Sequence, residues 1–150
     1  MNESKIKIRL MKEDDFDAIV RIDERVHNAS RPEYYKAKLE RFVQSKDCIP
    51  TSLVAETEDG TVVGFVMGEL YIGEYGISDD RATLDTIGVD PAHQNKGIGE
   101  QLIQEFMDHL RSLGIRRINT LVDWNNFTLI QFFSANQFSL SKTINLARSL

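Results

Sequence analysis

The sequence predicts an α/β fold, classed as α+β in some schemes, in which helices flank a mixed β-sheet. Segments with alternating polar and apolar residues precede longer segments whose apolar residues recur at helical spacing. In the second half of the chain, one helical segment is long enough to join two parallel strands by a crossover. The 150 residues have an ordinary globular composition, 41% hydrophobic and 27% charged, and most simply make one domain.

The N-terminal third predicts a strand followed by two helices. Residues 5–11 alternate as a strand does, and residues 13–23 begin with acidic side chains, which favour the first turn of a helix. Residues 32–44 predict the second helix, because proline suits its first turn and apolar residues follow at helical spacing. That apolar stripe comprises Tyr35, Leu39, Phe42 and Val43.

The middle of the chain predicts strands. Residues 51–71 contain two apolar runs joined by Asp59 and Gly60, a dipeptide typical of a tight β-hairpin. After a glycine-containing loop, residues 82–90 predict a further strand.

The remaining residues predict a helix, a strand, a short helix and a last strand. These elements span residues 98–113, 116–123, 127–138 and 141–147, and Gly114 suits the end of the first helix. The aromatic side chains of this part are predicted to lie in the core; they are Trp124, Phe127, Phe132 and Phe133.

Charge and cysteine content restrict partners and location. The net charge is -5 and the basic residues are scattered, which disfavours nucleic-acid binding. The N-terminal segment mixes charge into each apolar run, so we expect neither a signal peptide nor a membrane span. The single cysteine, Cys48, cannot form an internal disulfide, which fits a cytoplasmic protein. We expect no metal site, because His27, His93 and His109 lack ligand spacing.

Residues 90–102, DPAHQNKGIGEQL, lie where one predicted strand has ended and the long helix begins. Free backbone N–H groups and the helix dipole favour an anion at such a position. Gly97 and Gly99 leave room for close approach to the backbone, and Lys96 adds a positive charge. The pattern predicts a phosphate-binding loop; a tight loop that binds nothing is the alternative.

The sequence does not match two common nucleotide-binding motifs. The sequence contains no Walker A string G-x-x-x-x-G-K-[ST]. The dinucleotide fingerprint G-x-G-x-x-G lacks its third glycine, since Leu102 stands there. Because an acidic residue, Asp123, ends the next predicted strand, a nicotinamide- or nucleotide-binding enzyme stays open as an alternative.

The segment GVDPAHQNKGIGEQLIQEFMDHLRSLG resembles the acetyl-CoA-binding segment of the GNAT superfamily of acyl-CoA-dependent N-acetyltransferases. The family signature is Gln or Arg, two residues, Gly, one residue, then Gly or Ala, and Gln94, Gly97 and Gly99 meet it. The order of elements is similar too. The resemblance implies a single N-acetyltransferase domain over residues 1–150 with a GNAT-like fold, in which a mixed, mostly antiparallel central sheet has splayed parallel strands and flanking helices.

The resemblance also implies acetyl-CoA as co-substrate. Backbone groups at the end of the strand would bind the pantetheine arm, and N–H groups at the start of the helix would hold the pyrophosphate. In that family an asparagine contacts the cofactor, and a phenylalanine follows twelve residues later. Asn126 and Phe138 have this spacing. The implied cofactor-binding residues are Ile87, Gly88, Val89, Gln94, Asn95, Lys96, Gly97, Ile98, Gly99, Glu100, Asn126 and Phe133.

The tyrosine that protonates the departing thiolate in that family is replaced by Phe133, and Gln137 stands where glycine is common. Phe133 can line a thioester pocket but has no proton to give. A thiol pKa of about 8.5 makes thiolate a tolerable leaving group, so water, Tyr71 or Tyr75 can supply the proton.

A base is also needed, because an amine with a pKa of about 10.4 is almost wholly protonated at neutral pH. Strand alternation predicts that Asp85 shares one face with Ile87 and Val89, and so faces the reacting centre as base or water-positioning acid. Glu69 is the reserve candidate, and a purely structural carboxylate is the alternative for both. The N–H group of Val89 would polarise the carbonyl.

We therefore expect transfer of an acetyl group from acetyl-CoA to a primary amine by direct attack in a ternary complex. The acceptor is a protein N-terminus, a lysine or a small amine. A non-catalytic acyl-CoA sensor or regulatory module is the alternative, favoured by the missing tyrosine. The resemblance leaves the oligomeric state open, with a homodimer as one option because many proteins of that family are dimers.

Overall fold

The computed structural model describes residues 5–28, 31–44, 51–70 and 81–150. Its strands are β1 Lys7–Leu10, β2 Leu53–Glu56, β3 Val62–Leu70, β4 Arg81–Val89 and β5 Arg117–Asn119. Its helices are α1 Phe16–His27, α2 Pro32–Gln44, α3 Ile98–Ser112 and α4 Phe127–Ala135, with short 3-10 turns at Glu13–Asp15 and Pro91–His93.

The strands form one sheet in the order β1-β2-β3-β4-β5. The first three pairings are antiparallel, and β4 pairs with β5 in parallel. Helix α3 provides the crossover between the two parallel strands, as its length predicts. The prediction of a mixed, mostly antiparallel sheet is therefore confirmed.

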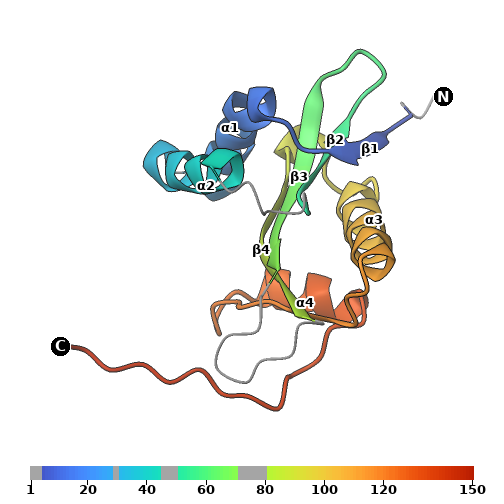
Figure 1. Cartoon of the computed structure of the whole chain (residues 1–150). Coiled ribbons are helices and arrows are strands. Elements are labelled where there is room, and N and C mark those ends of the chain that lie inside the picture. The colour runs from blue at the N-terminus through green and yellow to red at the C-terminus, as the bar shows by residue number, and fades with distance from the viewer. Residues whose placement is uncertain (1–4, 29–30, 45–50, 71–80) are drawn as a thin grey trace.

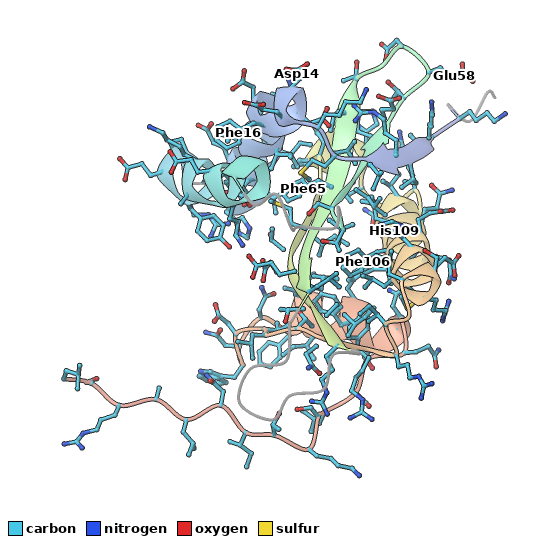
Figure 2. The ribbon with its side chains drawn as sticks, viewed as in Figure 1. Asp14, Phe16, Glu58, Phe65, Phe106 and His109 are labelled. Carbon is cyan, nitrogen blue, oxygen red and sulfur yellow. The ribbon has the colours of Figure 1, made fainter. Side chains whose placement is uncertain are left out.

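Helices cover both faces of the sheet (Figure 1). Alternation along β2 directs Val54 toward α1 and α2 and Ala55 toward α3. Figure 2 labels Phe65 of β3 and Phe106 of α3, which belong to the two separate apolar clusters on these faces. The two clusters hold the flanking helices in place, because each buries the apolar stripe of its own helices.

The pairing of β3 with β4 contains a β-bulge. Met67 lies opposite Thr86 and Gly68 opposite Leu84, so Asp85 is an extra residue without a partner on β3. A Cβ at Gly68 would lie 2.5 Å from Cζ of Phe106, so glycine lets α3 approach the sheet beside the bulge.

The bulge makes one sequence-based prediction wrong. Ile87 packs into the cluster on the α3 face, whereas Asp85 bonds to Lys38 of α2 on the opposite face. Simple alternation would have placed Asp85 and Ile87 on one face. The extra residue in β4 shifts the alternation by one position. The available signal was the apolar spacing, because Leu84 and Ile87 stand three residues apart and yet pack into the same cluster.

The C-terminal part differs from the prediction in two ways. Residues 141–147 form no strand, and residues 139–150 are all exposed. A strand needs a hydrogen-bonding neighbour, and no described residue pairs with this segment. The prediction that the aromatic residues lie in the core is right for Phe133 and wrong for Trp124 and Phe127, which are 83% and 71% exposed.

Candidate functional site

The two parallel strands separate beside the proposed pantetheine site. Pairing of β4 with β5 ends at Thr83, opposite Asn119, and Thr120 adds one bond from Oγ1 to the Leu84 carbonyl at 2.9 Å. No pairing of β4 with β5 is described for residues 87–89. Their backbone therefore lies along an edge to which an extended ligand can add, as a further strand would.

The loop after β4 is held by Asp90, whose side chain is almost fully buried. Asp90 accepts a hydrogen bond from the N–H of Ala92 at 2.9 Å and forms an ion pair with Arg25 of α1 at 2.7 Å. Gln94 donates a side-chain hydrogen bond to the Val89 carbonyl at 3.0 Å. Sequence reasoning missed Asp90 and Arg25 as positioning residues; the Asp-Pro step was the available signal, since aspartate before a turn often caps it.

The start of α3 has the geometry of an anion site. Gly97 is the N-cap, with φ of 79° in the left-handed region that glycine adopts without strain. The first helical bond runs from Gln101 N–H to the Gly97 carbonyl at 3.0 Å, so the amides of residues 98–100 precede the hydrogen-bond ladder. A Cβ at Gly97 would meet only Oε2 of Glu100, at 3.9 Å, which leaves open space above the loop. These features fit a pyrophosphate group.

Gly99 has a different role from Gly97. A Cβ at Gly99 would lie 3.1 Å from Cε2 of Phe132 on α4. The absence of a side chain therefore lets the first turn of α3 pack directly on α4. Gly99 therefore permits close packing of α3 on α4, whether or not a ligand also approaches its backbone.

Helix α4 carries two of the residues that the resemblance implied for the cofactor. Asn126 is its N-cap and accepts a hydrogen bond from the Leu129 N–H at 3.2 Å. Phe133 is 4% exposed, and its ring centroid lies 5.0 Å from that of Phe138. Both residues thus stabilise the protein whether or not they also contact a ligand. Gln137 has φ of 72°, which is the conformation for which glycine is preferred after a helix.

Asp85 forms an ion pair with Lys38 of α2, with 2.9 Å between Oδ2 and Nζ. Neither side chain is freely exposed, and the Lys38 ammonium also lies 5.0 Å from the ring centroid of Tyr34. Burial lowers the pKa of Lys38, but the hydrogen bond and charge of Asp85 outweigh it, so the pKa lies above its usual value. Lys38 is therefore a fixed cation beside the Asp85 carboxylate at neutral pH.

A second network joins α1, α2 and the bulge. Asp23, 2% exposed, accepts hydrogen bonds from Arg31 at 2.6 Å and from the Tyr35 hydroxyl at 2.8 Å, and Thr86 of β4 bonds to the same Tyr35 side chain. Burial opposes ionisation of Asp23, but these hydrogen bonds and the Arg31 charge prevail and hold its pKa below the usual value. The network fixes the helices against the strand that carries Asp85.

Of the other catalytic candidates, the structure describes only Glu69. Glu69 of β3 lies opposite Thr83 and is exposed. Tyr71 and Tyr75 lie outside the described residues, as does Cys48.

Two other kinds of site are absent from the described part of the chain. No helix there combines the length and the apolar character needed to cross a bilayer. Over the same residues, His, Cys, Asp and Glu side chains form no group of three or more that could hold a metal ion.

Comparison with known proteins agrees with this geometry. The family model of the acetyltransferase (GNAT) family matches residues 16–138. An acetyltransferase of Pectobacterium atrosepticum is 26% identical over 145 residues, which cover 97% of this chain and 96% of that protein. Mycothiol acetyltransferase of Propionibacterium freudenreichii subsp. shermanii is 30% identical over 95 residues, but they make up only 28% of that protein and 61% of this chain.

A solved structure shows the same fold. The aminoglycoside N-acetyltransferase AAC(6')-Iy in complex with CoA matches with a TM-score of 0.79 and 19% identity, over 99% of this chain and 97% of that one. The chain therefore belongs to the acetyltransferase (GNAT) family, so the predicted fold, the enzyme class and acetyl-CoA as co-substrate are confirmed.

Proposed function

We propose that this protein transfers the acetyl group of acetyl-CoA to a primary amine by direct attack within a ternary complex. The observation that carries the proposal is the open edge of β4 at residues 87–89, next to the free amides of residues 98–100. One extended ligand with a phosphate group can contact both. We further propose that residues 1–150 act as one N-acetyltransferase domain in the cytoplasm, and that the protein is a homodimer.

Acetyl-CoA would be held along this line of backbone groups. Residues 87–89 would bind its pantetheine arm, and the N–H groups of residues 95–100 its pyrophosphate, with Gln94 keeping the intervening turn in place. Asn126 and Phe133 would contribute from α4. When bound, acetyl-CoA supplies an acyl thioester. The N–H group of Val89 would stabilise the negative charge that develops on the carbonyl oxygen.

Asp85 is the proposed base or water-positioning acid. Lys38 occupies one oxygen of Asp85, Oδ2, at 2.9 Å, so part of the acceptor capacity of the carboxylate remains for an amine or a water molecule. Its position on the α2 side of the sheet suits an amine that arrives from that side, opposite Ile87. Glu69 is the second candidate base.

The general acid is proposed to be water or Tyr71, because Phe133 carries no proton. Thiolate with a conjugate-acid pKa of about 8.5 leaves without strong acid assistance near neutral pH. The proposal therefore predicts turnover despite the missing tyrosine.

Thiol release from acetyl-CoA tests the proposal when measured with and without a panel of amines. An aminoglycoside belongs in the panel because a fold neighbour is named for that substrate. Lysine, a peptide with a free N-terminus and a simple diamine complete it. Direct attack predicts amine-dependent release with intersecting initial-velocity lines. Parallel lines would instead indicate a covalent acyl-enzyme, and binding without release on any amine would support the sensor alternative.

A further inference from the structure

The face of β4 that lies toward α2 carries polar residues. Ala82 and Leu84 pack into the apolar cluster on the α3 face. Strand alternation therefore directs Arg81 and Thr83 to the opposite face, which also holds Asp85. The apolar cluster on that face contains no residue of β4 or β5. In Figure 1, α1 and α2 lie beside the upper part of the sheet, and the start of β4 extends beyond them toward α4.

Strand β5 extends this polar surface. In the parallel pairing, Arg117 lies opposite Arg81. Asn119 lies opposite Thr83 in the same register. Ile118 packs into the cluster on the α3 face, so its two neighbours point toward the α2 side. We call the resulting surface the polar face; it comprises Arg81, Thr83, Asp85, Arg117 and Asn119.

Two arginines stand side by side at one end of the polar face. Neighbouring strands of a sheet lie about 4.8 Å apart, and like charges at paired positions destabilise the sheet. Among the described residues, no hydrogen bond or ion pair offsets the charges of Arg81 and Arg117. Arg117 is exposed and Arg81 is half-buried, so a ligand can reach the pair. A carboxylate or phosphate suits this position, because guanidinium groups bind such oxygens with paired hydrogen bonds and the anion would remove the repulsion.

A buried hydroxyl lies between the arginines and the bulge. Oγ1 of Thr83 is shielded from solvent and has no hydrogen-bond partner among the described residues. Buried hydroxyl groups are nearly always hydrogen-bonded, because an unsatisfied one has lost its bonds to water without compensation. A polar ligand that lies along the face would supply the missing partner. The Thr83 hydroxyl therefore indicates a ligand here independently of the charges.

The polar face has charge of opposite sign toward its two ends. Near the bulge Asp85 is acidic, and so is Glu69 of β3, which lies opposite Thr83. At the start of β4, Arg81 and Arg117 are basic. Arg81 and Asp85 are four positions apart in the sequence, which is at most about 13 Å along a strand. A molecule with an ammonium group and an anionic group at or somewhat below this separation therefore matches both ends.

We propose that the acceptor of the acetyl group is a primary amine that also carries a carboxylate or a phosphate. Its amine lies at Asp85, and its anionic group binds Arg81 and Arg117. This inference rests on the proposed acetyl transfer and names the substrate class of the same site. A polycation such as an aminoglycoside lacks the anionic group and would bring further positive charge to the arginine pair, so it should be a poor acceptor.

Two forms of one peptide test the role of the anionic group. Trialanine spans about 10 Å when extended and ends in a carboxylate, whereas trialanine amide has the same shape without that charge. Thiol release at saturating acetyl-CoA should give a kcat/KM at least about tenfold higher for trialanine, because the amide loses charge-assisted contacts. A primary alkylamine of similar length that ends in a phosphate then distinguishes the two anions. The compound with the higher kcat/KM identifies the anion that the arginines prefer.

A pair of variants assigns the preference to the arginines. Arg81→Gln with Arg117→Gln removes both charges and the repulsion between them, so this variant should fold. Its kcat/KM values for trialanine and trialanine amide should become equal. The matched control, Lys7→Gln with Lys36→Gln, removes two positive charges from exposed residues elsewhere and should keep the wild-type preference.

The outcomes separate this inference from the proposed function. Equal kcat/KM for both peptides in the wild type, an unchanged preference in the arginine variant, or an equal loss of preference in both variants would overturn the acceptor class. Acetylation of a diamine or an aminoglycoside in preference to trialanine would also overturn it, while acetyl transfer itself would stand. Absence of thiol release on every amine would overturn the proposed function, and the acceptor class with it.

Discussion

At the scale of single residues, Gly97 offers the sharpest test of cofactor binding. Replacing Gly97 by leucine puts a side chain into the open space at the start of α3 and should weaken acetyl-CoA binding at least about tenfold. Gly114→Leu is the matched control, because Gly114 has nearly the same φ, 83° against 79°, and also has open space around it. Both variants lose similar stability, but calorimetric titration should show weaker binding for Gly97→Leu alone. Equal loss of affinity in both would refute the site.

Asp85 and Lys38 form the second residue-scale test. Asp85→Asn should lower kcat about a hundredfold, the ordinary size of general-base catalysis, with little change in acetyl-CoA affinity. Lys38→Met removes the ion-pair partner that holds the Asp85 carboxylate in place, so kcat should fall by a smaller factor, again with little change in acetyl-CoA affinity.

Lys36→Met on the same helix is the control for Lys38, since Lys36 is exposed and its replacement should leave kcat unchanged. A kcat that stays at the wild-type value in Asp85→Asn would mean that Asp85 is a structural carboxylate only.

At the scale of elements, the Asp23 network docks α1 and α2 on β4. Tyr35→Phe removes a hydrogen bond to a buried carboxylate and should lower the free energy of unfolding by about 1.5–3 kcal/mol. Tyr34→Phe changes a neighbouring, exposed side chain in the same way and should cost much less. Urea unfolding compares the two. Equal losses would show that the Tyr35 hydrogen bond does not hold the helices.

The same elements should respond to acid. Burial raises the pKa of Asp15 and of Asp23, but hydrogen bonds from Arg9 to Asp15 and from Arg31 and Tyr35 to Asp23 outweigh it and lower both pKa values. Stability from a lowered carboxyl pKa is fully present above the unfolded value of about 3.9 and is lost as the pH falls through the folded value.

The free energy of unfolding should therefore fall steeply only below about pH 4. The double variant Asp15→Asn with Asp23→Asn should be less stable at neutral pH and should lose this steep acid dependence. Unfolding curves at a series of pH values measure both effects, and an unchanged slope would contradict the assigned cause.

At the scale of the whole molecule, sequence reasoning succeeded where a local pattern has a local cause. The hairpin at Asp59 and Gly60, the long helix before Gly114 and the glycine N-cap at Gly97 follow from turn chemistry and helical periodicity. Sequence reasoning failed where pairing with another strand determines the local structure. The bulge at Asp85 depends on pairing with β3. The alternating pattern of residues 141–147 predicts a strand, but no described residue pairs with them and the strand is absent.

The central claim is that acetyl-CoA lies between β4 and the start of α3, and amide hydrogen exchange with and without acetyl-CoA tests it most directly. Bound cofactor should slow exchange at residues 87–89 and 95–100, with no comparable change in β1 or β2. Protection confined to other segments, or none at saturating acetyl-CoA, would contradict the account.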